Sequence, residues 1–93
     1  MSDVAERIAR TVLLIHRFKG GKLSRVDLRS GLLEPRLFLD PMDLSQVIVA
    51  IERAFGCSLR RYRRRLRTWQ DLVEQIERSM RYMRRSHLSM NRR

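Results

Sequence analysis

The segment from Asp40 to Gly56 constrains the fold more than any other part of the chain, because it contains a complete pattern for one amphipathic helix. Asp40 is a good N-cap, Pro41 suits the first helical position, and Asp43 follows three residues after the cap. Gly56 is expected to end the helix. The apolar residues recur at helical spacing and predict a buried face of Leu44, Val47, Ile48, Ile51 and Phe55. Such a face needs a packing partner, which favours a helical bundle.

A second amphipathic pattern covers residues 3–18. Ser2 or Asp3 can cap its start, and the pair Gly20-Gly21 is expected to end it. The stripe predicted for this helix comprises Val4, Ile8, Val12, Ile15 and Phe18. We expect this stripe to pack against the helix that begins at Pro41.

The last long helix is expected from Thr68 to about Arg84. The run Thr68-Trp69-Gln70-Asp71 is close to a capping box, with an aspartate in the place of glutamate or glutamine. The apolar stripe predicted here comprises Trp69, Leu72, Val73, Ile76, Met80 and Met83.

Two connecting segments are less regular. Residues 58–66 are predicted to form a short helix, with Leu59, Tyr62 and Leu66 directed inward. Residues 22–39 contain the breakers Gly31 and Pro35, but they are too apolar for a freely solvated loop. We therefore expect this connection to lie across the bundle and to bury several of its apolar residues.

These elements predict an all-α fold, a small four-helix bundle with three longer helices and one short helix. The helical domain is expected to cover residues 1–85, and residues 86–93 are expected to form a basic C-terminal tail. The residues predicted to share one core are Val12, Ile15, Leu44, Val47, Ile48, Ile51, Phe55, Leu72, Val73 and Ile76.

Composition limits the classes of protein to which the chain can belong. No apolar run approaches the roughly 20 residues needed to cross a bilayer, and Asp3 and Glu6 interrupt any signal-peptide pattern, so a cytoplasmic location is expected. Cys57 is the only cysteine, which excludes an internal disulfide and a cysteine-based zinc site. His16 and His87 have no metal-like spacing to another ligand. We expect no bound metal, no cofactor and no catalytic residue.

Positive charge is concentrated at the C-terminal side of the chain, which has a net charge of +11. Residues 1–59 contain nine Lys and Arg and seven Asp and Glu, a net charge of +2. Residues 60–93 contain twelve Arg and three acidic residues, a net charge of +9. This asymmetry predicts attraction to a polyanion, an acidic protein or an anionic membrane surface.

Three local matches resemble the acyl carrier protein family. Asp40-Pro41-Met42-Asp43 stands where these carriers have Asp-Ser-Leu-Asp, and Ala50-Ile51-Glu52-Arg53-Ala54-Phe55-Gly56 is similar to their Ala-Leu-Glu-Glu-Glu-Phe-Gly. Thr68-Trp69-Gln70-Asp71-Leu72-Val73 resembles the Thr-x-x-Asp-Leu-Val at the start of their last helix. The resemblance covers about residues 3–80 and implies a carrier-type bundle of four helices.

Pro41 departs from the family pattern at the position of greatest functional consequence. In carriers a serine at this position receives phosphopantetheine, and the helix N-terminus favours the phosphodiester. Proline has no hydroxyl and no N–H, so it preserves a helix start but abolishes this attachment. Ser45 lies one turn further on and is expected to be an ordinary helix serine rather than a relocated attachment site.

The second departure is charge. The residues predicted to bind a partner are Arg60, Arg61, Arg63, Arg64, Arg65 and Arg67, where carriers tend to be acidic. A solvated face is the simplest explanation of a charge run, but six arginines in eight residues also suit bidentate binding of carboxylate or phosphate. Tyr62 and Trp69 could stack on bases, although core positions are favoured for both.

Three hypotheses follow. The leading one is a non-enzymatic, carrier-like domain without a phosphopantetheine attachment site, which binds an acidic protein, such as a true acyl carrier protein or a synthase component of fatty-acid or polyketide-type biosynthesis. The second is a basic helical domain that binds nucleic acid, for which the sequence pI of about 11.6 is the main support. The third is a working acyl carrier with an unusual attachment site.

Overall fold

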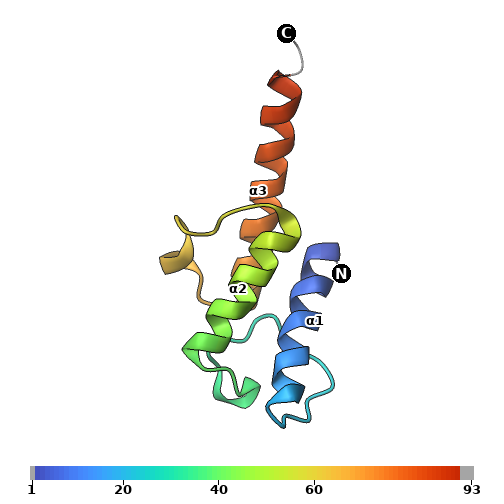
Figure 1. Cartoon of the computed structure of the whole chain (residues 1–93), viewed down its shortest axis with the longest axis vertical. Coiled ribbons are helices and arrows are strands. Elements are labelled where there is room, and N and C mark those ends of the chain that lie inside the picture. Colours follow the sequence, from blue (N-terminus) through green and yellow to red (C-terminus); the bar gives the residue numbers. More distant parts are fainter. Residues whose placement is uncertain (1, 91–93) are drawn as a thin grey trace.

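The computed structural model describes the backbone of residues 2–90 and the side chains of residues 2–84. Its elements, in chain order, are α1 (Asp3–Phe18), the 3₁₀ turn η1 (Pro35–Leu37), α2 (Pro41–Phe55), the 3₁₀ turn η2 (Arg63–Arg65) and α3 (Trp69–Met90). No β-strand forms in this part of the chain, where one isolated bridge joins Gly31 to Thr68. The predicted all-α class is therefore confirmed. Figure 1 shows α1, α2 and the first half of α3 side by side, with α3 continuing beyond the other two helices.

The predicted fourth helix does not form. Within residues 58–66 only the short turn η2 is helical, so the described chain has three α-helices rather than four. Leu59 and Leu66 are both buried, as predicted, but the residues between them are mostly exposed arginines. So short a segment, with apolar contacts only near its two ends, gains too little burial to offset the cost of helix nucleation.

The end of α3 also differs from expectation. The helix continues to Met90, past the predicted end near Arg84, and so includes part of the segment that was expected to form a basic tail. Residues 91–93 of that predicted tail lie outside the described residues.

The predicted starts of α1 and α2 are confirmed by their hydrogen bonds. The Ser2 hydroxyl caps α1 by accepting from the backbone N–H three residues later, at 3.1 Å. Pro41 is the first residue of α2, and Asp40 and Asp43 form a reciprocal capping box around it. The Asp43 N–H donates to Asp40 Oδ1 at 2.8 Å, and the Asp40 N–H donates to Asp43 Oδ2 at 3.0 Å. These local bonds satisfy N–H groups that a helix start otherwise leaves unpaired.

The predicted start of α3 and end of α2 are also present. The Asp71 N–H donates to the Thr68 hydroxyl at 3.1 Å, and the Thr68 N–H donates to Asp71 Oδ2 at 3.0 Å. Gly56 ends α2 in the left-handed conformation, with φ of 64°, and its N–H donates to the carbonyl of Glu52. A residue without Cβ adopts this conformation without steric cost.

One hydrophobic core lies among the three helices. Of the residues predicted to share it, those fully buried are Val12, Val47, Ile48, Ile51, Leu72, Val73 and Ile76. Ile15, Leu44 and Phe55 are partly buried and pack against this core. Val4, Ile8, Leu59 and Trp69 complete much of its volume. The core prediction is thus confirmed, with three of its members at the edge.

Phe18 was predicted on the buried stripe of α1, and this was wrong, because its side chain is 91% exposed. His16 continues the stripe instead and is 1% exposed. At 3.6 residues per turn, residue 16 is separated from Val12 by roughly 40° around the helix, whereas residue 18 is separated from it by roughly 120°. The apolar character of Phe18 therefore misled the prediction, although the helical geometry favours His16.

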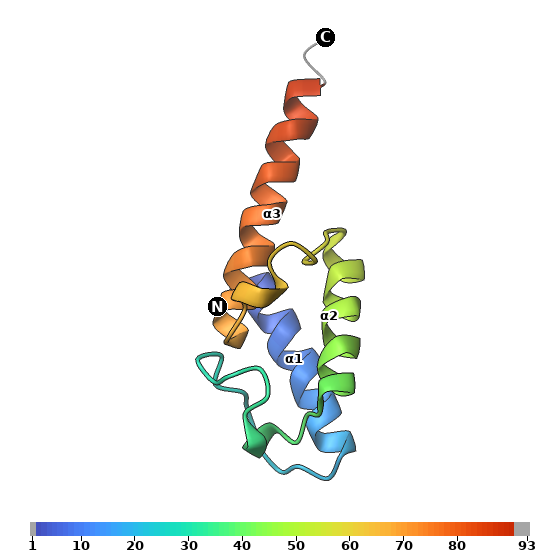
Figure 2. The ribbon, with the colours of Figure 1, turned by 90° about the vertical axis from the view of Figure 1, so that its left-hand side faces the viewer.

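The connection between α1 and α2 crosses the end of the bundle, as Figure 2 shows. Val26, Leu37 and Leu39 are buried, whereas Leu23 and Phe38 are exposed, so the predicted burial holds for part of the segment. The connection also reaches the start of α3, where the backbone N–H groups of residues 69 and 70 donate to carbonyls of residues 30 and 28, at 3.3 and 2.7 Å.

The central position of Ile51 gives a stability prediction. Ile51 is 1% exposed, and its replacement by alanine should lower the free energy of unfolding by about 2–5 kcal/mol, because the removed atoms leave a cavity. Val49 on the same helix is 44% exposed, so Val49→Ala should change the free energy by no more than about 0.5 kcal/mol. Urea unfolding followed by circular dichroism measures both, and equal effects would contradict the core described above.

Candidate functional site

Residues 60–67, here called the arginine segment, connect the end of α2 to the start of α3. All six of its arginines, Arg60, Arg61, Arg63, Arg64, Arg65 and Arg67, are exposed. In Figure 1 the segment, drawn in yellow and orange, projects from the side of the bundle. None of the six forms an ion pair with an acidic side chain of the described residues. The segment therefore presents unneutralised positive charge to the surroundings.

The backbone at both ends of the arginine segment is held by hydrogen bonds. Before the segment, the Leu59 N–H donates to a carboxylate oxygen of Glu52 at 2.7 Å. At its end, the Arg67 N–H donates to Asp71 Oδ2 at 2.9 Å, and the Arg67 carbonyl accepts from the Leu32 N–H at 3.1 Å. These bonds fix where the chain carrying the arginines runs.

An apolar hollow of about 400 Å³ lies beside the arginine segment and is called here the Leu33 hollow. Its walls come from the connection between α1 and α2, from α2 and from the arginine segment. Leu33, Leu44 and Leu66 contribute apolar surface, and Arg63 and Arg67 lie at its edge. The hollow therefore combines an apolar surface with two cationic groups.

Two further hollows adjoin the arginine segment. One, of about 300 Å³, is lined by Arg60, Arg63 and Glu52, and the other, of about 430 Å³, by Arg60, Arg61 and Met83. Together with the Leu33 hollow, each of the three hollows is lined by two arginines of the segment. The arginines thus border concave surface rather than a uniformly convex face.

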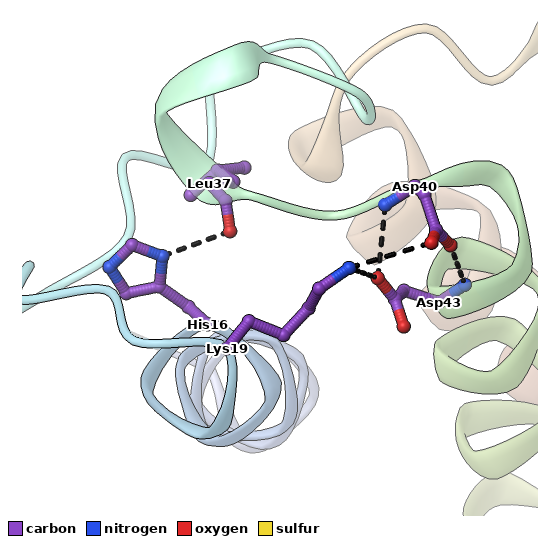
Figure 3. A network of polar contacts seen from close by, with 5 residues as sticks. All are labelled: His16, Lys19, Leu37, Asp40 and Asp43. Carbon is purple, nitrogen blue, oxygen red and sulfur yellow. Dashed lines mark hydrogen bonds and ion pairs between the residues drawn. The ribbon is translucent and has the colours of Figure 1, made fainter.

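Pro41 lies at the exposed start of α2, where the resemblance to carriers implies an attachment position. Figure 3 shows the polar contacts around this helix start. Lys19 Nζ pairs with Asp40 at 3.5 Å and also with the carboxylate of Asp43. The hydrogen bond from Lys19 lowers the pKa of Asp43 below its ordinary value, and the same bond raises the pKa of Lys19. Lys19 therefore compensates part of the negative charge of the two carboxylates at this helix start.

Ser45 is half-buried, and its hydroxyl accepts a hydrogen bond from Arg63 Nη2 at 3.0 Å. This bond connects α2 directly to the arginine segment. Ser45 therefore differs from an exposed or backbone-bonded helix serine, because its partner is the Arg63 side chain.

His16 is a polar residue of this region whose structural role was missed from the sequence. Its Nδ1 lies 2.9 Å from the Leu37 carbonyl, and its Nε2 lies 3.0 Å from the Leu23 N–H. A carbonyl only accepts and an N–H only donates, so Nδ1 carries the proton and the imidazole is neutral. Figure 3 shows this imidazole between α1 and η1. The four-residue spacing from Val12 was the available signal.

Gly21 explains why the chain can turn closely over His16. A Cβ at Gly21 would overlap the imidazole ring, so any larger residue here would displace the ring or the backbone. The Phe38 ring covers another side of the imidazole, with ring centroids 5.3 Å apart. His16 is therefore enclosed by the connection that it holds.

The other residues considered as possible functional residues are Trp69, Tyr62, Cys57 and His87. Trp69 is fully buried in the core, as favoured, and Tyr62 is half-buried. Cys57 is half-buried, and burial raises the pKa of its thiol, which disfavours the nucleophilic thiolate. The side chain of His87 lies outside the described residues. Nowhere in the described part of the chain do three potential metal ligands gather.

Among the described residues, no helix combines the length and apolar character required to span a membrane. Comparison of the chain with protein-family models, with curated proteins and with solved structures finds no match in any of the three.

The contacts of Asp43 predict a pH-dependent contribution to stability. Because folding lowers the pKa of Asp43 below its ordinary value of 3.8, its ionised form stabilises the fold above that value, and the contribution is lost as the pH falls through the folded-state pKa. Asp43→Asn should therefore lower the thermal midpoint at neutral pH, and the difference from the unsubstituted protein should narrow in acid.

Glu74→Gln is the matched control, since Glu74 is exposed on α3 and makes no hydrogen bond or ion pair with the described residues. Its midpoint should follow that of the unsubstituted protein at every pH. Circular dichroism melts over an acid series measure all three proteins, and a difference for Asp43→Asn that widens in acid would contradict the assignment.

Proposed function

We propose that this protein is a non-enzymatic, acyl-carrier-like interaction domain that has no phosphopantetheine attachment site and binds an acidic protein through the arginine segment. The observation that carries the proposal is the arginine segment itself. Its backbone is hydrogen-bonded at both ends, its six guanidinium groups are exposed, and pairs of them border three hollows. A surface of this kind favours carboxylate groups on a partner.

The carrier-like part of the proposal is supported by the order of the elements and by the start of α2. A long helix, a long connection, a second helix and a last helix follow one another in the order that the resemblance implies, but the short helix before the last one is absent. The capping box of Asp40 and Asp43 encloses Pro41 at the position that corresponds to the attachment serine. The turn η2 takes the place of the short third helix of carriers.

Loss of the attachment site is supported by the chemistry available at this helix start. Pro41 has neither the hydroxyl needed to attack the pyrophosphate of coenzyme A nor an N–H to bind the resulting phosphodiester. Ser45 is one turn away and half-buried against Arg63, which disfavours it as a substitute.

An acidic protein is preferred as the partner because the arginines are distributed around concave and partly apolar surface. Guanidinium groups bind carboxylates bidentately, and a folded partner can fill hollows that a phosphate backbone would leave empty. The partner class that we propose is a true acyl carrier protein or another acidic component of fatty-acid or polyketide-type synthesis. Nucleic acid is the competing ligand, favoured by the charge alone.

Replacing arginines of the segment tests this surface. Changing Arg60, Arg63 and Arg67 together to serine should weaken binding to an acidic acyl carrier protein by about tenfold or more, because charge pairs are lost. Helical content should stay nearly unchanged, since exposed substitutions usually alter stability by no more than about 0.5 kcal/mol each. Isothermal titration calorimetry and circular dichroism measure the two effects.

The matched control replaces Arg7, Arg10 and Arg25, three exposed arginines outside the segment, by serine. It changes the net charge equally and should bind like the unsubstituted protein. Random-sequence duplex DNA is the competitor, with an affinity that should fall with salt by a log–log slope of about −0.9 per neutralised phosphate. If DNA binds at physiological salt and the carrier protein never does, the proposed partner class is wrong. If both triple variants bound the carrier protein with the same affinity, that affinity would depend on the total charge and not on the arginine segment.

The lost attachment site gives a separate prediction. Incubation with coenzyme A and a broad-specificity phosphopantetheinyl transferase should leave the mass of the purified protein unchanged, since position 41 offers no hydroxyl. Intact-mass spectrometry measures this, with a true acyl carrier protein in the same reaction as the positive control. Modification of the unsubstituted chain, at Ser45 or elsewhere, would refute the loss of carrier function.

A further inference from the structure

We propose that the Leu33 hollow is the anchoring site for an acidic amphipathic helix of the partner, which inserts an apolar side chain between Arg63 and Arg67. This inference rests on the proposed function, because it specifies which structural element of an acidic partner the arginine segment binds. The inserted side chain would add an apolar contact to the arginine segment, whose charge alone would not distinguish one acidic partner from another.

The Leu33 hollow exposes apolar surface to a ligand, and a backbone hydrogen bond joins two of its walls. Leu33 is 45% exposed, whereas Ile48 and Leu66 are buried beneath the surface. The hydrogen bond between the Leu32 N–H and the Arg67 carbonyl joins the connection to the arginine segment, which sets the distance between two of the walls. An apolar side chain entering the hollow would remove this surface from water, which is favourable.

The charges at the edge of the hollow select the occupant. Arg63 and Arg67 are exposed at its edge and form no ion pair with the described residues. Glu34 also lines the hollow, but its carboxylate accepts from the Arg36 side chain at 3.0 Å and from the Arg36 backbone N–H at 2.9 Å, so its charge is compensated locally. An apolar side chain flanked by carboxylates is therefore the complementary group.

Other occupants fit these charges less well. Residues 84–93 of the chain contain four arginines and no acidic residue, so this segment would be repelled by Arg63 and Arg67. A second copy of the protein, with a net charge of +11, would be repelled in the same way. The bases of a single strand fill such hollows by stacking on aromatic rings, and no aromatic side chain lines this hollow.

A helix is favoured over an extended peptide because a second hollow continues the surface along α2. The Glu52-lined hollow shares Ile48 and Arg63 with the Leu33 hollow, so the two are adjacent. A helix presents apolar side chains three and four residues apart on one face, which suits insertion into successive hollows of this kind. Carboxylates on the flanks of the same helix would meet the arginines.

The test uses a fluorescein-labelled designed peptide of about 16 residues, long enough for four helical turns. Its leucines follow helical spacing on one face, and glutamates occupy most other positions. A second peptide has the same composition with the leucines scrambled around the helix. Fluorescence anisotropy with the full chain, at about 150 mM NaCl, should show binding of the amphipathic peptide and at least about fivefold weaker binding of the scrambled one. Equal binding would overturn the anchoring site, because charge alone would then explain the affinity.

Leu33→Ser tests the protein side of the contact. It should weaken the amphipathic peptide about fivefold to tenfold without a change in circular dichroism, since Leu33 is partly exposed. The matched control is Leu14→Ser, on an exposed position of α1, which should bind like the unsubstituted protein. If Leu33→Ser binds the peptide normally while the arginine variant still fails to bind the acidic protein, the anchoring site is wrong and the proposed function survives.

Two outcomes would have wider consequences. If neither Leu33→Ser nor the triple arginine variant alters any binding, both the anchoring site and the proposed function are wrong. If dodecanoate binds the protein and Leu33→Ser abolishes that binding but leaves the peptide unaffected, the hollow accepts a small anionic amphiphile rather than a helix, and the proposal is overturned.

Discussion

The buried imidazole of His16 is the contact on which the arrangement of the connection between α1 and α2 depends. Its Nε2 accepts from the Leu23 N–H near the start of the connection, and its Nδ1 donates to the Leu37 carbonyl near the end. These two bonds define the neutral tautomer. Removing one partner would leave a buried polar group unpaired, at a cost of about 1–3 kcal/mol. The same contact determines where residues 37–40 lie. The place at which α2 starts beside α1 therefore depends on a residue that belongs to α1, whereas its capping box forms from local bonds.

The arginine segment can remain exposed because buried leucines hold the chain in place at both of its ends. Burying a leucine side chain contributes about 1.5–3 kcal/mol, and Leu59 is buried just before the arginine segment and Leu66 within it. Two exposed unit charges about 4 Å apart interact with only about 1 kcal/mol in water, and salt reduces this further. Burial therefore outweighs repulsion between neighbouring guanidinium groups. The fold can hold a concentrated positive charge that is available to a partner.

The start of α2 has the residues that a stable helix start needs, but it lacks the hydroxyl that phosphopantetheine attachment needs. Proline at the first helical position, with Asp40 and Asp43 as reciprocal caps, makes a well-formed helix start. The same residues offer no hydroxyl at position 41, where the resemblance to carriers implies the attachment serine. This helix start is therefore well formed without the chemistry of attachment, and protein binding is the function that we propose for the chain.

The sequence by itself determined the features that depend on residues within one helical turn. The caps at Ser2, Asp40 and Thr68, the stop at Gly56, and the apolar stripe of α2 all follow from local hydrogen bonds or from the helical period, and the structure has them where the pattern predicted. Only the tertiary structure decided the rest. The way the connection closes over His16 depends on partners such as Leu37, which lies 21 residues away in the sequence. The Leu33 hollow likewise requires the pairing of residue 32 with residue 67, because such long-range contacts arise only when distant segments pack together.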